Sequence, residues 1–106
     1  MDSQLKKGFL ETCVLANLKK ADSYGYRIIQ EITPLIKTSE STLYPVLRRL
    51  EDKNLVSTYS KEYNGRLRKY YQLTAMGNDK LNEFKEEAEH ITQIMDYILE
   101  KGDYHE

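Results

Sequence analysis

Apolar positions in the first third of the chain repeat with the period of amphipathic helices. The first run, residues 3–20, carries a stripe made of Leu5, Phe9, Cys13 and Ala16, broadened by Leu10, Val14 and Leu18. A second, shorter run places on one face Gly25, Ile28, Ile29 and Ile32. Two helices are therefore predicted, with Asp22 or Ser23 as the N-cap of the second. Pro34 then ends the helical pattern, and Ile36 is expected to begin a very short strand.

The segment SESTLYPVLRRLEDKNL, residues 39–55, predicts a third helix although Pro45 lies inside it. Its apolar residues form one helical stripe, made of Leu43, Val46, Leu47 and Leu50. A start near Ser41 or Thr42 would leave Pro45 close to the first turn, where at most one hydrogen bond is lost. Asn54 is expected to end this helix because asparagine tolerates the left-handed conformation.

The rest of the chain predicts a hairpin and one long helix. Two runs rich in Val, Thr and Tyr flank Asn64 and Gly65, which is the strongest short signal for a β-hairpin. Thr74 is expected to cap a helix that continues to about residue 101. Its apolar residues are spaced as in the seam of a coiled coil and are Leu81, Phe84, Ala88, Ile91, Met95 and Ile98. The alternative is that this helix packs back on its own domain.

Three helices followed by a basic hairpin are typical of a winged helix-turn-helix. We therefore predict a mostly α fold with a small antiparallel β-hairpin. A DNA-binding winged helix-turn-helix would span residues 1–73. Residues 74–106 would form a C-terminal dimerisation helix that packs with the first helix, so that the chain is one globular unit.

In this fold the third helix enters the major groove of DNA and the hairpin, or wing, touches the flanking backbone. Cationic and hydroxyl side chains supply the chemistry, because they neutralise phosphates and read base edges. The predicted DNA contacts are Ser41, Thr42, Tyr44, Pro45, Arg48 and Arg49 on the helix, with Lys61, Arg66, Arg68 and Lys69 on the wing. A winged helix that serves as a protein-interaction module, without specific DNA binding, remains the alternative.

The distribution of charge agrees with a polyanionic partner for one part of the chain. The net charge is only −1, yet residues 1–73 hold 13 Lys and Arg against 8 Asp and Glu, whereas residues 74–106 hold 3 against 9. The first part could face a polyanion, while the second would be repelled by it.

Other classes of protein find little support in the sequence. The single cysteine, Cys13, is expected to be a small buried residue in a reducing compartment. His90 and His105 stand apart from other ligands, so neither a metal site nor a cofactor is predicted. No nucleophile and base pattern indicates an enzyme. Because no secretory signal or membrane-length apolar run is found, we expect a cytoplasmic protein.

Three blocks, SYGYRIIQEI, STLYPVLRRLEDKNLV and NGRLRKYYQLTAMG, occur in this order, and together they resemble the PadR family of bacterial transcriptional regulators. The resemblance implies a dimeric winged-helix protein, usually a repressor that a small aromatic or drug-like effector releases from DNA. It implies that Tyr44, Pro45 and Arg48 belong to the recognition helix, and that Arg68 and Lys69 belong to the wing. The single C-terminal helix resembles the compact branch of that family.

A homodimer would bring together the apolar residues of the first and last helices. The predicted interface consists of Leu5, Phe9, Leu81, Phe84, Ala88, Ile91, Met95 and Ile98. An effector pocket could be lined by Phe9, Phe84, Ala88 and Ile91, although a fully packed interface is an equal alternative. Two-fold symmetry would place the recognition helices about 34 Å apart on a pseudo-palindromic operator in double-stranded DNA.

Overall fold

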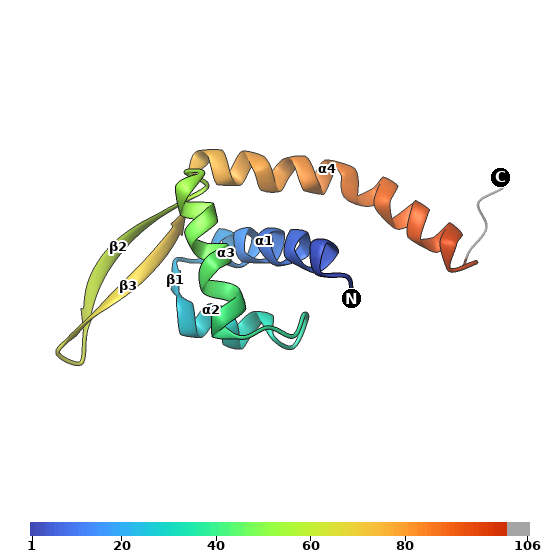
Figure 1. Ribbon diagram of the computed structural model, residues 1–106. Helices are drawn as coiled ribbons and strands as arrows, with labels where there is room; N and C mark the ends of the chain where they lie inside the picture. The colour runs from blue at the N-terminus through green and yellow to red at the C-terminus, as the bar shows by residue number, and fades with distance from the viewer. Residues whose placement is uncertain (102–106) are drawn as a thin grey trace.

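The computed structural model describes residues 1–101 as a mostly helical molecule with a small sheet (Figure 1). The elements are α1 (Ser3–Lys20), β1 (Ser23–Tyr24), α2 (Gly25–Ile32), α3 (Glu40–Asp52), β2 (Val56–Tyr63), β3 (Arg66–Leu73) and α4 (Ala75–Ile98). This is the order of a winged helix-turn-helix followed by a long helix, which confirms the predicted fold class. The end of the predicted C-terminal segment, residues 102–106 with His105, lies outside the described residues.

The core is built mainly from the first three helices. It contains Leu10, Val14, Leu15 and Leu18 of α1, Ile28 and Ile32 of α2, and Leu43, Val46, Leu47 and Leu50 of α3. All four residues predicted for α3 are thus buried. Leu10, Val14 and Leu18 of the predicted α1 stripe are buried, whereas Leu5 is 54% exposed and Phe9 is 37% exposed in the single chain. The core lies against a different face of that helix, which leaves this pair for another partner.

The first strand of the sheet is β1, which was not predicted. It pairs antiparallel with β3, aligning Ser23 with Tyr71 and Tyr24 with Tyr70, and the strand order is β1-β3-β2. Ser23 is therefore a strand residue rather than a helix cap, and Tyr24 is the N-cap of α2 without a side-chain bond. Ile36 belongs to no strand. A two-residue strand is stabilised by its partner strand and is too short to show the alternation of apolar and polar residues by which strands are predicted.

Helix α3 begins at Glu40, slightly before the predicted start, so Pro45 lies in its second turn. Because proline has no backbone N–H, Pro45 cannot donate the helical hydrogen bond that the Ser41 carbonyl would otherwise accept. At the other end, Asn54 has a positive φ of 62°. The Leu55 N–H donates to the Leu50 carbonyl at 2.9 Å, and the Asn54 N–H donates to Glu51 at 2.9 Å. This is a Schellman motif, and it confirms Asn54 as the stop.

Strands β2 and β3 form the wing, and their turn is the predicted one. Asn64 and Gly65 have φ values of 51° and 78°, as a type I′ turn requires at both central residues. Side chains alternate between the two faces of this ribbon. One face lies toward α3, and the other forms the outer surface of the wing.

Helix α4 starts on the base of the wing and ends far from it (Figure 1). The Thr74 hydroxyl accepts a hydrogen bond from the Gly77 N–H at 2.9 Å, which confirms the predicted cap. Leu81 is buried in the core against α1, whereas the C-terminal half of α4 projects beyond the other helices. The helix ends at Ile98, slightly short of the predicted residue 101. In residues 1–101 no helix is long and apolar enough to cross a membrane.

Candidate nucleic-acid interface

The outward face of α3 gathers most of the residues predicted to bind DNA. Because Leu43, Val46 and Leu47 point into the core, the residues between them face solvent. The exposed set is Ser41, Thr42, Tyr44, Pro45 and Arg48. At the start of the helix, the hydroxyl oxygens of Ser39 and Ser41 are 3.1 Å apart. This face therefore offers hydroxyl groups near its N-terminal end and a guanidinium one to two turns later.

Tyr44 also joins α3 to α2. A Cβ atom added to Gly25 would overlap the end of the Tyr44 ring, so the ring would have to shift to admit any other residue there. Tyr44 remains 36% exposed, and its partial burial raises the pKa of its phenol. The hydroxyl therefore stays protonated at neutral pH and can donate a hydrogen bond to a partner.

Glu51 of α3 contacts both strands of the wing. Its carboxylate lies 3.6 Å from the Lys69 ammonium, and it accepts a hydrogen bond from the Thr58 hydroxyl at 3.2 Å. Together with Arg48, these two charged residues border a hollow of about 300 Å³ between α3 and the wing. Lys69 faces α3, and Glu51 offsets part of its charge, which the sequence did not indicate.

The outer face of the wing holds Arg68 between aromatic rings. The guanidinium carbon of Arg68 is 4.0 Å from the centre of the Tyr24 ring and 3.9 Å from that of Tyr63. Tyr59 and Tyr70 stack beside this clamp with their ring centres 5.5 Å apart. Cation–π contacts of this kind hold the side chain in place. Arg68, which was predicted to contact DNA, connects the wing to β1 in the structure.

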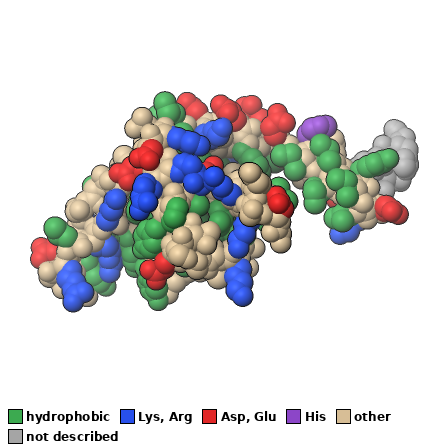
Figure 2. All heavy atoms as spheres, in the orientation of Figure 1, with side chains coloured by type: hydrophobic (Ala, Val, Ile, Leu, Met, Phe, Trp, Pro, Cys, Tyr) green, Lys and Arg blue, Asp and Glu red, His purple; other side chains and the backbone are tan. Residues whose placement is uncertain are grey.

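The four predicted cations of the wing do not form one surface. Strand register pairs Lys61 with Arg68 and places Arg66 opposite Tyr63, so these cations share the outer face, while Lys69 lies on the face toward α3. Lys61 and Arg66 are exposed near the tip. Figure 2 shows Lys and Arg side chains around α3 and toward the tip of the wing.

Arg49 does not share the exposed face of Arg48. Its Nε donates to a carboxylate oxygen of Glu11 on α1 at 2.7 Å, and both side chains are about three-quarters buried, at 29% and 25% exposed. Successive residues of a helix are rotated by about 100°, which turns Arg49 toward α1. Arg49, predicted as a DNA contact, thus joins α3 to α1 in the structure.

The predicted dimer and effector residues lie along α1 and α4. Phe84, Ala88 and Ile91 are half-buried, and Met95 and Ile98 are 47% and 63% exposed. Leu81, by contrast, is only 2% exposed within its own chain, so it has almost no surface left for a partner. Helix α4 therefore packs back on its own domain at its N-terminal end, whereas its C-terminal end, with Met95 and Ile98, projects beyond the domain (Figure 1).

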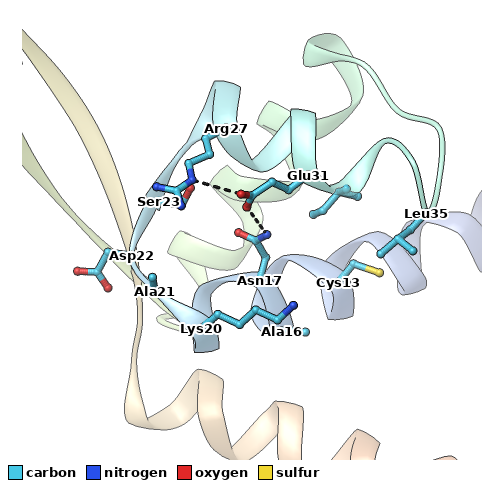
Figure 3. Close-up of a pocket in the computed structure, with 11 residues that line it drawn as sticks. Cys13, Ala16, Asn17, Lys20, Ala21, Asp22, Ser23, Arg27, Glu31 and Leu35 are labelled. Carbon is cyan, nitrogen blue, oxygen red and sulfur yellow. Dashed lines mark hydrogen bonds and ion pairs between the residues drawn. The ribbon is translucent and has the colours of Figure 1, made fainter.

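A separate hollow of about 380 Å³ lies between α1, β1 and α2 (Figure 3). Glu31 accepts hydrogen bonds there from Asn17 at 3.0 Å and from Arg27 at 3.3 Å. The bond from Asn17 and the nearby Arg27 lower the pKa of the Glu31 carboxyl, whereas burial raises the pKa of the Cys13 thiol. Cys13 is half-buried against the core, and no group of three metal-binding side chains occurs among residues 1–101.

Comparison with known proteins agrees with this architecture. Uncharacterized protein X of Lysinibacillus sphaericus is 35% identical over 103 residues, which cover 92% of this chain and 94% of that protein. The crystal structure of smu.1704 from Streptococcus mutans UA159 has a TM-score of 0.80 at 41% identity and covers 92% of each chain. The PadR-like transcriptional regulator BC4206 from Bacillus cereus has a TM-score of 0.83 at 31% identity, covering 95% of this chain and 100% of that one.

The family model described as "Transcriptional regulator PadR-like family" matches residues 14–83, which include α2, α3 and the whole wing. Its members are transcriptional regulators and not enzymes, in agreement with the class predicted from the sequence. Since this model matches more than half of the chain and the solved structures share its fold, the chain belongs to the PadR-like family of transcriptional regulators.

Proposed function

We propose that the protein binds double-stranded DNA sequence-specifically as a homodimer in the cytoplasm. In this proposal α3 lies in the major groove of the operator and the wing lies on the flanking backbone. The observation that carries it is the outward face of α3, on which Tyr44, Pro45 and Arg48 are exposed beside the wing. Hydroxyl and guanidinium groups on a helix of this fold match the donors and acceptors of base edges.

Each exposed group has a distinct chemical task in this proposal. Arg48 can donate two hydrogen bonds to guanine, and the hydroxyls of Ser41 and Thr42 can bind base edges or phosphates. Lys61 and Arg66, near the tip of the wing, neutralise phosphates outside the major groove. Lys69 contributes less, because Glu51 already offsets part of its charge.

Dimerisation is supported by apolar side chains that one chain leaves uncovered. Leu5 and Phe9 of α1 and Met95 and Ile98 of α4 are all more than one-third exposed. Figure 2 shows apolar side chains on the projecting end of α4. A second copy would cover these residues, and the two-fold axis would set two α3 helices about 34 Å apart on a pseudo-palindromic site.

We further propose that the protein is a repressor, and that a small aromatic or drug-like effector releases it from DNA. The effector would bind between the domain and the paired α4 helices, near Phe9, Phe84, Ala88 and Ile91. Binding there would release DNA only if the effector preferred a dimer with a different spacing of the two recognition helices. The half-buried state of the three α4 residues, Phe84, Ala88 and Ile91, leaves surface for such a contact.

Fluorescence anisotropy tests the central proposal. The protein is titrated on a duplex from its own upstream region and on a shuffled duplex, at about 50 and 200 mM salt. We expect tight, salt-sensitive binding with a clear preference for the native duplex. Binding that ignores the sequence, or does not occur, would contradict the proposal and favour a winged helix that binds another protein.

A further inference from the structure

A second groove borders α3 on the side opposite the wing. It lies between α3 and the N-terminal end of α1 and has a volume of about 460 Å³. Figure 1 shows the wing on one side of α3 and the N-terminus on the other. The lining residues are Ser3, Lys6, Lys7 and Leu10 of α1, with Ser41, Thr42, Pro45, Val46 and Arg49 of α3. Three of these α3 residues, Ser41, Thr42 and Pro45, belong to the face proposed to meet DNA.

The groove carries positive charge that its own chain does not cancel. Lys6 is half-buried at its edge and Lys7 is exposed. Among residues 1–101 neither the Lys6 nor the Lys7 ammonium forms an ion pair, and Glu11 of α1 is already paired with Arg49 at 2.7 Å. The two ammonium groups are therefore free to neutralise an outside anion.

Lys7 points to a different side of α1 from the apolar pair proposed for the dimer, and Lys6 lies between these two sides. Lys7, Leu10 and Val14 are spaced three and four residues apart, so Lys7 continues the core-facing side of the helix past the end of the core. Leu5 and Phe9 share another side and are exposed. The basic groove and the apolar pair can thus serve two partners at the same time.

From these observations we infer that Lys6 and Lys7 bind phosphates of the same DNA duplex, on the strand across the major groove from the wing. A helix in the major groove has a phosphate backbone on each side. The wing meets one backbone, and the N-terminal end of α1 meets the other. Arg49 does not reach the duplex in this arrangement, since Glu11 holds it and its Nη2 is covered. This inference rests on the proposed DNA binding by α3.

The test compares three double variants with wild-type full-length protein in the anisotropy assay, over a series of salt concentrations. Lys6→Gln with Lys7→Gln removes both charges, and Lys6→Arg with Lys7→Arg keeps them. Lys19→Gln with Lys20→Gln removes the same charge about 20 Å away, at the other end of the same helix. Sedimentation fixes a protein concentration at which every variant has the wild-type oligomeric state.

Each lost phosphate contact lowers the slope of log affinity against log salt by about 0.9, so the first variant should lose about 2 per bound chain. Its affinity should fall about tenfold per lysine at about 0.1 M salt. The arginine variant and the Lys19/Lys20 variant should retain the wild-type slope. If the first variant also retains the wild-type slope, or if the Lys19/Lys20 variant loses as much, the contact assigned to Lys6 and Lys7 is wrong while DNA binding by α3 stands. A wild-type protein without salt-dependent binding would overturn both.

Discussion

At the scale of single residues, close contacts determine which residue types fit at particular positions. Gly77 shows this most clearly, because a Cβ atom at this position would overlap the backbone carbonyl oxygen of Leu55 at the base of the wing. Leu55 itself is fixed by the Schellman motif that ends α3. The start of α4, the end of α3 and the wing therefore meet at a point that has no space for a side chain.

We accordingly expect Gly77→Ala to lower the free energy of unfolding by about 3 kcal/mol, since a backbone segment must shift to admit the new atom. Met76→Ala is the matched control, because Met76 lies in the same turn and is 56% exposed. That change should stay within about 0.5 kcal/mol of wild type. Urea denaturation of the two variants checks this, and equal stability would show that the turn is free to move.

Pro45 is a second residue whose role is tested by a small change. Its ring lies on the exposed side of the second turn of α3, where it costs one backbone hydrogen bond. Pro45→Ala restores the N–H for the Ser41 carbonyl, so the unfolding free energy should hold or rise by up to about 1 kcal/mol. If Pro45 fixes the path of the turn that meets the bases, operator affinity should nevertheless fall severalfold. Denaturation and anisotropy on the same preparation separate the two effects, and parallel losses in both would refute this role.

At the scale of elements, the sequence predicted those parts of the fold whose signals are local. Asn64 with Gly65 and Asn54 mark a hairpin turn and a helix end by their own conformations, and both were predicted. The β1 strand was missed because Ser23 and Tyr24 owe their state to β3, far along the chain. The sequence predicted which side chains would lie on the exposed face of α3, but not the intrachain partners of the cations. Nothing in the local pattern reveals that Arg49 pairs with Glu11, or that Lys69 pairs with Glu51.

The wing provides a prediction at this scale. Arg68→Ala should lower the melting temperature, because two cation–π contacts to Tyr24 and Tyr63 are lost. Arg68→Lys should restore stability only in part, since an ammonium is attracted to the rings but cannot stack on them as a planar guanidinium does. Arg66→Ala, at the exposed tip, should leave stability unchanged and reduce the salt slope of DNA binding by about 0.9. Thermal melts and anisotropy distinguish the roles. An Arg68→Ala protein with wild-type stability and a reduced slope would make Arg68 a direct phosphate contact.

At the scale of the whole molecule, shape and charge place the proposed DNA-binding surface and the proposed dimer surface on different parts of the chain. The chain measures 60 × 27 × 21 Å and has a radius of gyration of 16.1 Å, against about 13 Å for a compact domain of this size. The projecting parts are the wing and the end of α4 (Figure 1). Acidic side chains gather along α4, on the upper edge in Figure 2, and they would be repelled by DNA. The charge thus orients the proposed duplex toward α3 and leaves α4 for the second copy.

The end of α4 provides the last prediction. Met95→Glu with Ile98→Glu places two negative charges on the apolar residues of α4 that a second copy is proposed to cover. Burying a charge that has no partner is costly, so these charges should oppose association. We expect this variant to sediment as a monomer at about 10 μM, with its helix content preserved because both residues are exposed in the single chain. Its affinity for the operator should fall by 10²-fold or more, since the two half-sites are then bound independently.

The matched control is Asn82→Glu with His90→Glu. Both residues are exposed, and both lie away from the stripe that holds Leu81, Phe84 and Ile91. The control adds the same charge to the same helix, so a general repulsion of DNA by α4 would weaken both variants equally. Loss of the dimer in the first variant alone assigns the interface to the apolar stripe. A dimer that survives in both variants would mean that another surface joins the two chains.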